Sequence, residues 1–168
     1  NFELLAAVDP DMIVTFGGDD STTYDQASAI APTVAVPVDV NDWKTSARSI
    51  GETMGRSDEM EAELARYDAR VADLRDRLGD AIDTEVSIVR SFGDSIRLHT
   101  RFHFAGQVVD DVGLDEAVRT LREHPLFPTL RVADDDALFV VDPLAWQQGG
   151  LPAANLILDD LERTLLPS

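Results

Sequence analysis

The chain has 168 residues, of which 44% are hydrophobic and 27% are charged, so it can bury the core of one or two small domains. Its formal net charge of −18 argues against nucleic acids and anionic membranes as partners, because both need cationic surfaces. Without cysteine there is no disulfide or thiolate site, and no run of 18 apolar residues predicts a membrane span. Asn1–Val8 does not resemble a signal peptide, so we expect a cytoplasmic protein or a chain that starts downstream of its targeting segment.

The first 55 residues alternate between helical and strand patterns. A short apolar run after the turn at Asp9–Asp11 is typical of a buried parallel strand. Pro32 stops the following helix, and Asp42 is placed to cap the next one. The elements expected here are the end of a helix at Phe2–Val8, a strand at Met12–Phe16, a helix to about Ala29, a strand at Val34–Val36 and a helix at Trp43–Met54 that ends at Gly55.

A long amphipathic helix is predicted between Ser57 and Ile82. Its apolar stripe consists of Met60, Leu64, Tyr67, Val71, Leu74 and Leu78, at spacings of three and four residues. Ser57 is a favourable N-cap, and Gly79 supplies a stop. A helix of roughly 21 residues spans about 30 Å, so we expect a strut between two lobes, with Leu64, Val71 and Leu74 buried.

The rest of the chain mixes strand and helix patterns and forms the third of three predicted domains. We expect a hairpin of strands Val86–Arg90 and Ile96–His99 joined at Gly93-Asp94, a loop at Thr100–Gly106, helices at Gln107–Val112 and Asp115–Glu123, a strand at Ala137–Val141 and a closing helix after Gly149-Gly150. The loop combines aromatic rings, a cation and a glycine, which a plain turn does not require. The predicted domains are part of an N-terminal α/β lobe (1–56), a bridging helix (57–83) and a C-terminal α/β lobe (84–168).

No constellation of residues indicates catalysis. The loop from Gly17 to Thr23 follows a strand, where α/β sheets bind ligands, but it lacks nucleotide-binding spacings, and Asp19 and Asp20 would repel a phosphate. A solvated turn is the simpler interpretation, and the alternative is a small metal-dependent α/β enzyme that holds a divalent ion with these two aspartates. His99, His103 and His124 lack a carboxylate at a ligand spacing, and Asp134–Asp136 lacks the EF-hand pattern. We therefore expect neither an enzyme nor a resident metal or cofactor.

Several segments resemble the substrate-binding proteins of iron-siderophore and vitamin B12 ABC importers. The resemblance covers nearly the whole chain, and the order of the segments is more specific than any one of them. They are Asn1-Phe2-Glu3 with the following residues to Val14, Ile30–Thr33, the Trp43 helix, Gly51–Gly55, the long helix, Phe104-Ala105-Gly106, Asp111–Leu114, Pro125–Phe127, and Trp146 before Gly149-Gly150 and Leu158–Leu161.

This resemblance implies an α/β fold of two Rossmann-like lobes bridged by one long rigid helix, as in class III periplasmic binding proteins. The family normally has a further half of the N-terminal lobe before Asn1, and a helix and strand between Leu114 and Asp115. Here these two residues are adjacent, so the chain is interpreted as truncated, with a segment missing after Leu114.

The implied function is that of an extracytoplasmic solute-binding protein, periplasmic or a membrane-anchored lipoprotein, that acts in iron uptake. It would capture a ferric siderophore between its lobes as a monomer and deliver it to an ABC permease, with haem or a corrinoid as alternative ligands. The resemblance makes Glu3 an exposed carboxylate that docks on arginines of the permease. The alternative is that Glu3 only stabilises the first turn of a helix.

The ligand is expected in a cleft lined by loops that follow predicted strands. The C-terminal lobe would supply Arg101, Phe102, His103 and Trp146, and the N-terminal lobe Phe16, Gly18 and Asp19. Anionic hydroxamate or catecholate oxygens suit Arg101, and flat organic arms suit aromatic faces. Arg90, Arg97 and Arg101 form the densest group of arginines near such a loop. The alternatives are a core ring for Trp146 and a solvated surface charge for Arg101.

Overall fold

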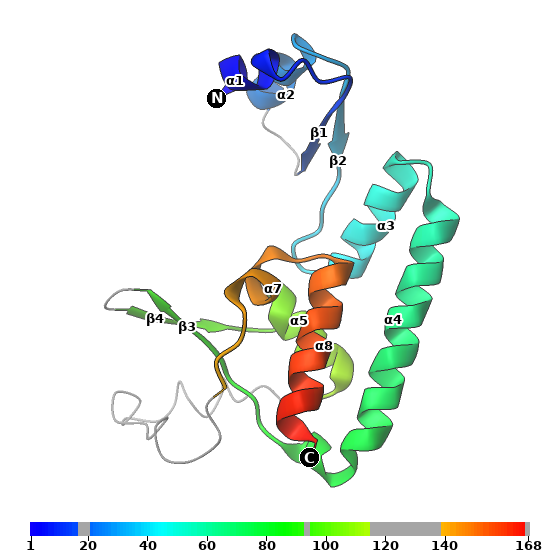
Figure 1. The fold of residues 1–168 in the computed structure, drawn as a ribbon, viewed down its shortest axis with the longest axis vertical. Helices are drawn as coiled ribbons and strands as arrows, with labels where there is room; N and C mark the ends of the chain where they lie inside the picture. Colours follow the sequence, from blue (N-terminus) through cyan, green and yellow to red (C-terminus); the bar gives the residue numbers. More distant parts are fainter. Residues whose placement is uncertain (17–20, 93–94, 115–138, 167–168) are drawn as a thin grey trace. The chain divides into compact units, whose positions relative to one another are not determined.

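The computed structural model describes most of the chain, which divides into two units (Figure 1). The described residues are 1–16, 21–92, 95–114 and 139–166. The first unit comprises Asn1–Asp39 and Lys44–Ala62, and the second unit comprises Val40–Trp43 and Glu63–Ser168.

A two-stranded parallel sheet with two short helices opens the first unit, as the sequence predicts. Its elements are α1 (Phe2–Ala7), β1 (Ile13–Phe16), α2 (Ser21–Ser28) and β2 (Thr33–Val36). Ile13 lies opposite Thr33 in the register. Ile13, Ala27 and Ala31 form a small core against which Phe2, Leu5 and Ile30 pack. The Asn1 side chain caps α1 by accepting a hydrogen bond from the backbone N–H of Glu3 at 2.9 Å.

A helical hairpin links α3 (Trp43–Thr53) to the long helix α4 (Ser57–Leu78). Gly55 has a φ of +66°, in the left-handed region that glycine tolerates, and this confirms the predicted end of α3. A Cβ on Gly51 would lie 2.7 Å from the Cβ of Met60, so the two helices approach closely at this glycine. Arg48 and Glu61 form an exposed ion pair at 2.8 Å across the same hairpin.

The apolar stripe of α4 is buried as predicted. The buried residues of the helix are Leu64, Tyr67, Val71, Leu74 and Leu78. α4 ends one turn earlier than expected, because Gly79 takes a φ of +50° and a 3-10 helix, η1 (Gly79–Asp83), follows. Within the described ranges, no helix combines the length and apolar character needed to cross a bilayer.

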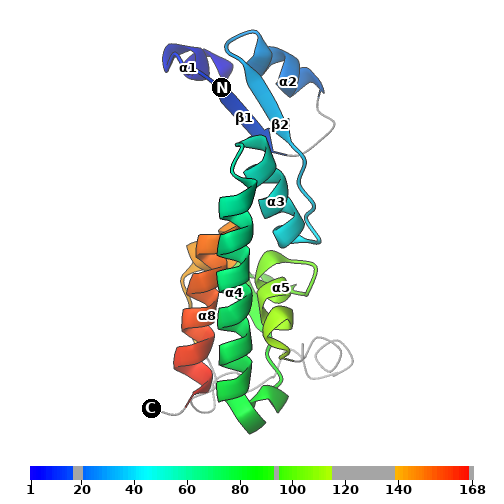
Figure 2. The same cartoon turned by 90° about the vertical axis from the view of Figure 1, so that its right-hand side faces the viewer.

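The second unit packs helices against the part of α4 that begins at Glu63. Its further elements are the antiparallel strands β3 (Ile88–Phe92) and β4 (Ser95–His99), and the helices α5 (Phe104–Val112), α7 (Pro143–Gln148) and α8 (Leu151–Leu165). α4 runs beside α8 in Figures 1 and 2. Arg70 on α4 donates to the carbonyl and side-chain oxygens of Asn155 at 3.0 Å and also pairs with Asp159 on α8.

Three predictions for the second unit need correction. α5 begins at Phe104, inside the stretch that was expected to be a loop to Gly106, because the Phe104 ring packs edge-on against Trp43 at 5.7 Å. Phe139–Val141, the described part of the strand expected at Ala137–Val141, is not in a strand. Helix α7 was missed, although Asp142 caps it by accepting from the N–H of Leu144 at 2.8 Å and Pro143 opens it.

Several predicted features lie outside the described residues. They are the Gly17–Asp20 part of the acidic loop, the turn at Gly93-Asp94, the helix Asp115–Glu123, His124, the segment Pro125–Phe127 and the turn Asp134–Asp136.

Candidate functional site

A tight turn between β4 and α5 carries three of the predicted ligand-binding residues. The backbone N–H of His103 donates to the carbonyl of Thr100 at 2.7 Å. In the opposite direction, the N–H of Thr100 donates to Nδ1 of the His103 ring at 3.2 Å. These two hydrogen bonds fix the conformation of the backbone that presents Arg101 and Phe102. His103 is also the N-cap of α5, so the turn leads directly into that helix.

Arg101 and Phe102 project from this turn into solvent. The Arg101 guanidinium lies over the Phe102 ring, 5.4 Å from its centroid, in a cation–π arrangement. Phe102 remains 61% exposed, so its ring is accessible to a ligand. The pair therefore offers one charged and one apolar contact on neighbouring side chains, which matches a ligand with both anionic oxygens and flat carbon arms.

Gly106 lets the turn lie directly on α5. A Cβ at this position would meet the carbonyl oxygen of Thr100 at 2.2 Å and the Cα of Arg101 at 2.8 Å, both of them backbone atoms. A larger residue would displace the turn, so glycine is required here for a close approach. The sequence signals a special glycine in this stretch, but it does not show which backbone lies against it.

Histidine and arginine side chains gather around the turn. The His99 and His103 rings lie 4.8 Å apart with a tilt of 31°. Burial lowers the pKa of His99 from its ordinary value, and the nearby His103 and Arg90 lower it further. The described residues contain no group of three histidine, cysteine or acidic side chains that could hold a metal ion.

Gln107 connects α5 to the segment that precedes α3. Its Oε1 accepts from the N–H of Trp43 at 2.9 Å, and its Nε2 donates to the carbonyl of Val40 at 3.0 Å. The Trp43 ring also packs edge-on against Tyr67, with centroids 5.0 Å apart. The sequence gives no signal for these contacts, which join residues far apart in the chain.

A buried hydrogen bond couples α4 to α5 next to these rings. The Tyr67 hydroxyl donates to the Asp111 carboxylate at 2.9 Å, and Tyr67 is only 1% exposed. Burial and the neighbouring Asp111 charge both raise the pKa of Tyr67, so the phenol stays protonated as a donor. The contact holds α5, and with it the turn at its N-terminus, against the long helix.

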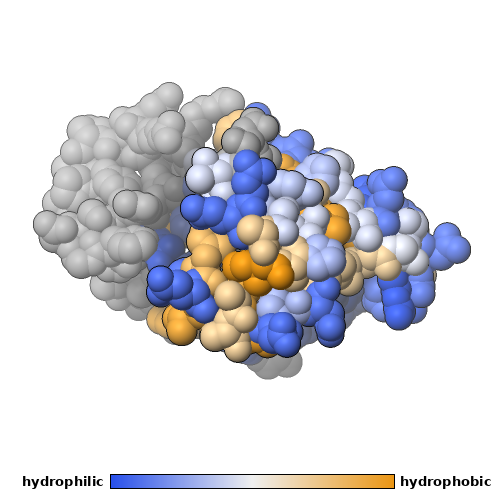
Figure 3. Space-filling model, turned by 90° about the horizontal axis from the view of Figure 1, so that it is seen from above, coloured by the Kyte–Doolittle hydropathy of each residue, from blue (hydrophilic) through white to orange (hydrophobic). Residues whose placement is uncertain are grey.

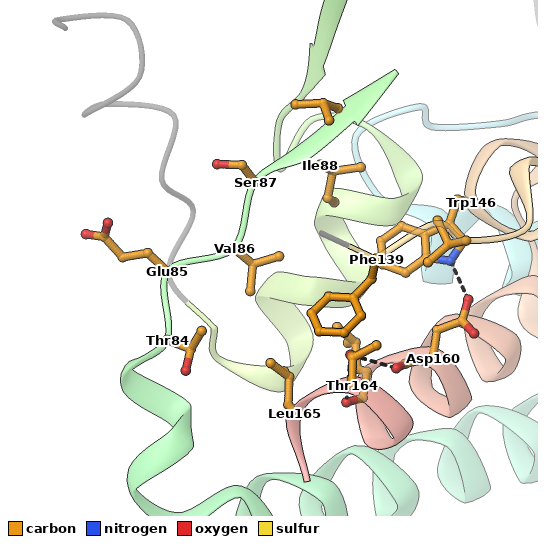
Figure 4. A pocket seen from close by; sticks show the side chains of 13 residues that line it. Thr84, Glu85, Val86, Ser87, Ile88, Phe139, Trp146, Asp160, Thr164 and Leu165 are labelled. Carbon is orange, nitrogen blue, oxygen red and sulfur yellow. Dashed lines mark hydrogen bonds between the residues drawn. The ribbon is translucent and has the colours of Figure 1, made fainter. Parts of the chain in front are cut away.

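Trp146 occupies a different environment from Arg101 and Phe102. Its ring is 8% exposed, and its Nε1–H donates to Asp160 on α8 at 2.8 Å. Figure 4 shows it at the rim of a pocket, with Phe139 beside it. The pocket has a volume of about 240 Å³, below the roughly 300–1,000 Å³ typical of small-molecule sites. Its lining is formed by Thr84–Val89, Phe139, Val141, Trp146, Asp160, Leu161, Thr164 and Leu165.

The remaining predicted site residues belong to the first unit. Phe16 ends β1 and is 64% exposed, as expected of a residue at the carboxyl end of a strand. Gly18 and Asp19 lie outside the described residues. Glu3 is exposed in the first turn of α1, a position compatible both with docking and with stabilisation of the helix. The structure thus groups Arg101, Phe102 and His103 in one turn, whereas Trp146 is engaged elsewhere with Asp160.

Comparison with curated proteins finds relatives whose names refer to siderophores. The chain is 26% identical to "Probable siderophore-binding lipoprotein YfiY" of Bacillus subtilis, a match that covers 99% of this chain and 66% of YfiY. It is also 26% identical to the petrobactin-binding protein YclQ of Bacillus subtilis, over 84% of this chain and 47% of YclQ. The chain therefore spans about two thirds or less of these relatives. The YfiY match extends over 215 positions, so YfiY carries residues within it that this chain lacks.

Solved structures share the fold. FhuD2 of Staphylococcus aureus with bound ferrioxamine B matches with a TM-score of 0.77 and 17% identity, over 98% of this chain and 79% of that one. This likeness confirms the predicted α/β fold class of periplasmic binding proteins. The family model described as "Periplasmic binding protein" matches residues 1–137, well over half of the chain. The chain belongs to the periplasmic binding protein family.

Proposed function

We propose that the protein is the solute-binding component of an iron-siderophore ABC importer, and that it binds a ferric siderophore and passes it to a membrane permease. The observation that carries this proposal is the family match over residues 1–137, together with relatives named for siderophores. The family and these relatives are binding proteins, which favours a transport role over catalysis.

The turn at Arg101 supplies the chemistry for such a ligand. A ferric hydroxamate or catecholate presents anionic oxygens around the metal, and a guanidinium can bind two of them at once. Phe102 offers an exposed ring for the organic arms. We propose that Arg101, Phe102 and His103 contact the chelate from the C-terminal lobe (84–168), together with Trp146.

Phe16, Gly18 and Asp19 are proposed as ligand contacts from the N-terminal lobe (1–56), and residues 57–83 as the bridging helix between the lobes. No resident cofactor is proposed, because the iron enters with the ligand. The Nε1–H of Trp146 is already bonded to Asp160, so the contact proposed for Trp146 is through its ring. Its contribution would then be to shape the wall of the site.

The proposed location is extracytoplasmic, either periplasmic or on a lipoprotein anchor, as the names of the relatives suggest. Glu3 is the proposed docking carboxylate for the permease, because it is exposed and lies at the start of α1. Its backbone N–H is bonded to Asn1, so only the carboxylate is offered to a partner.

Titration of the full-length protein with a panel of ferric siderophores tests the proposal. Trp43 and Trp146 are both buried and serve as intrinsic reporters, because a bound ferric chelate quenches nearby tryptophan emission. Haem and a corrinoid belong in the same panel. Saturable quenching by a ferric siderophore supports the proposal. Saturable quenching by haem or the corrinoid alone would show that the ligand belongs to that class instead.

Two variants then locate the site. Arg101→Ala should weaken binding of the tightest chelate by about 1–3 kcal/mol, the usual cost of losing a charged hydrogen bond. Arg56→Ala is the matched control, because Arg56 is also an exposed arginine and pairs only loosely with Glu59 at 3.4 Å. Equal affinities in the two variants would mean that other residues line the site.

A simpler assay distinguishes the proposed binding protein from the alternative, a metal-dependent α/β enzyme that uses Asp19 and Asp20. A ligand that binds only the native state raises its melting temperature. We expect no rise with Mg²⁺ or Mn²⁺ at millimolar concentration, and a clear rise with a ferric siderophore. A rise with the bare cation alone would favour the enzyme.

A further inference from the structure

The charge of this chain far exceeds what its own cations can balance. There are 32 aspartate and glutamate residues but only 14 lysine and arginine residues. Even if every cation paired with a carboxylate of its own, 18 carboxylates would remain unmatched, which is the formal net charge. Among the described residues no charged side chain is buried, so the charges of that part of the chain lie on its surface.

Part of the excess lies at the C-terminal end of α4, next to the two arginines of its last turn, Arg75 and Arg77. Asp76 lies in the last turn of α4, and Asp80 and Asp83 lie in η1, which follows directly; all three are exposed. The C-terminal end of a helix carries a partial negative charge, so carboxylates there repel the helix as well as one another. Hydrophilic side chains also border the apolar ones over the face seen in Figure 3.

The ion pairs that do form are mostly exposed and weakly stabilising. Arg48–Glu61, Arg56–Glu59 and Arg66–Glu63 are examples in which both side chains are about half exposed or more. Exposed pairs of this kind contribute little to stability. These pairs therefore offset little of the repulsion among the unmatched carboxylates, and a net charge far from zero disfavours the compact state.

We propose that the chain is adapted to a medium of high ionic strength, in which dissolved cations screen the repulsion on its surface and make the native state stable. The Debye length falls from about 10 Å at 0.1 M salt to about 3 Å at 1 M. At the higher concentration, the repulsion between surface carboxylates farther apart than about 3 Å is largely screened. This inference concerns diffuse screening, requires no specific ion site and does not depend on the identity of the ligand.

The use of arginine fits the same condition. Thirteen of the fourteen cations are arginines, and Lys44 is the single lysine. A guanidinium forms bidentate pairs in direct contact with carboxylates and is more weakly hydrated than an ammonium. Direct contacts such as those of Arg70 with Asn155 and Asp159, where Arg70 is partly buried, are screened less than distant charges.

Thermal unfolding of the 168-residue chain, followed by circular dichroism between 0.1 and 2 M KCl, tests the proposal. The parent melting temperature should rise steeply with KCl. The triple variant D76N/D80N/D83N should melt roughly 3 °C or more above the parent at 0.1 M, and the difference should vanish at 2 M. Asp58→Asn is the matched control, because Asp58 lies in the first turn of α4, where the helix dipole favours its charge, and this variant should not melt higher.

The comparison also separates screening from a general salting-out effect. Salting-out strengthens burial in both proteins and would raise their melting temperatures in parallel. A chain that is unfolded at 0.1 M KCl and folds on addition of the salt supports the proposal. A parent melting temperature that is flat or falls with KCl, equal slopes in parent and triple variant, or a chain that stays unfolded up to 2 M would overturn it.

Discussion

Val71 lies near the middle of α4 on its buried stripe and is only 7% exposed. Replacing it by aspartate places a carboxylate among Leu64, Tyr67 and Leu74 on that same stripe. The neighbouring position, Ala72, is exposed on the same helix. Ala72→Asp therefore adds the same charge on the same helix at a site where water remains.

The expected magnitude follows from the burial. Val71→Asp loses the burial of a valine, worth about 1.5–3 kcal/mol, and adds the cost of an unpaired polar group, at least about 1–3 kcal/mol. Ala72→Asp should cost no more than about 0.5–1 kcal/mol, mostly through helix propensity. We therefore expect Val71→Asp to be less stable than Ala72→Asp by about 3 kcal/mol, a large share of the 5–15 kcal/mol that stabilises a typical protein.

Urea unfolding followed by circular dichroism measures this difference directly. Both variants should be compared at 2 M KCl, so that the added charge is screened equally. Free energies of unfolding that agree within about 1 kcal/mol would show that Val71 is not buried in solution, and the assignment of the stripe to the core would be wrong.

Four further predictions rest on individual contacts. Gly106→Ala should weaken chelate binding at least tenfold without unfolding the protein, because a Cβ there would meet the Thr100 carbonyl oxygen at 2.2 Å. Calorimetric titration of the folded variant measures its affinity for the chelate, and an unchanged affinity would mean that the turn does not contact the ligand. Tyr67→Phe should lower the free energy of unfolding by about 1.5–3 kcal/mol, because Asp111 loses a charged hydrogen bond; a loss below about 0.5 kcal/mol in urea unfolding would contradict the buried contact. The pKa of His99 is lowered in the folded state, so the unfolded state takes up the proton first as the pH falls. The free energy of unfolding should therefore decrease as the pH drops below about 6.5. In urea unfolding between pH 8 and pH 5.5, His99→Gln should show a smaller decrease than the parent, and identical pH profiles would refute the prediction. Glu3→Ala in the full-length protein should impair uptake of the ferric siderophore but leave its affinity intact, and a loss of affinity would instead move Glu3 into the ligand site.

The sequence predicts best those features that depend on local periodicity. The spacing of apolar residues from Leu64 to Leu78 identifies the long helix and its buried face, and Gly79 marks its end to within a turn. The β3–β4 hairpin and the final helix α8 follow from alternation and from Gly149-Gly150 in the same way. Each of these signals is carried by neighbouring residues, so no tertiary information is needed.

Helix α7 was missed although its capping signals at Asp142 and Pro143 are local, whereas long-range contacts account for the other features that the sequence does not predict. The start of α5 at Phe104 depends on packing against Trp43, which is 61 positions earlier in the chain. The environment of Trp146 depends on its hydrogen bond to Asp160, a pairing that no spacing rule indicates. Likewise, the stretch around Arg101 can be singled out by its composition, but its conformation depends on contacts of His103 and Gly106 that only the structure provides.

The most direct test of the proposed function is the affinity of the full-length protein for one siderophore in its ferric and iron-free forms, measured by calorimetric titration in 2 M KCl. The tightest ferric siderophore of the panel is the ligand to use. The ferric chelate gathers its anionic oxygens around the metal, whereas the iron-free form is flexible and must be ordered on binding. We predict a submicromolar dissociation constant for the ferric form and binding at least tenfold weaker for the iron-free form. Equal affinity for the two forms, or no saturable binding of any ferric siderophore, would contradict the assignment.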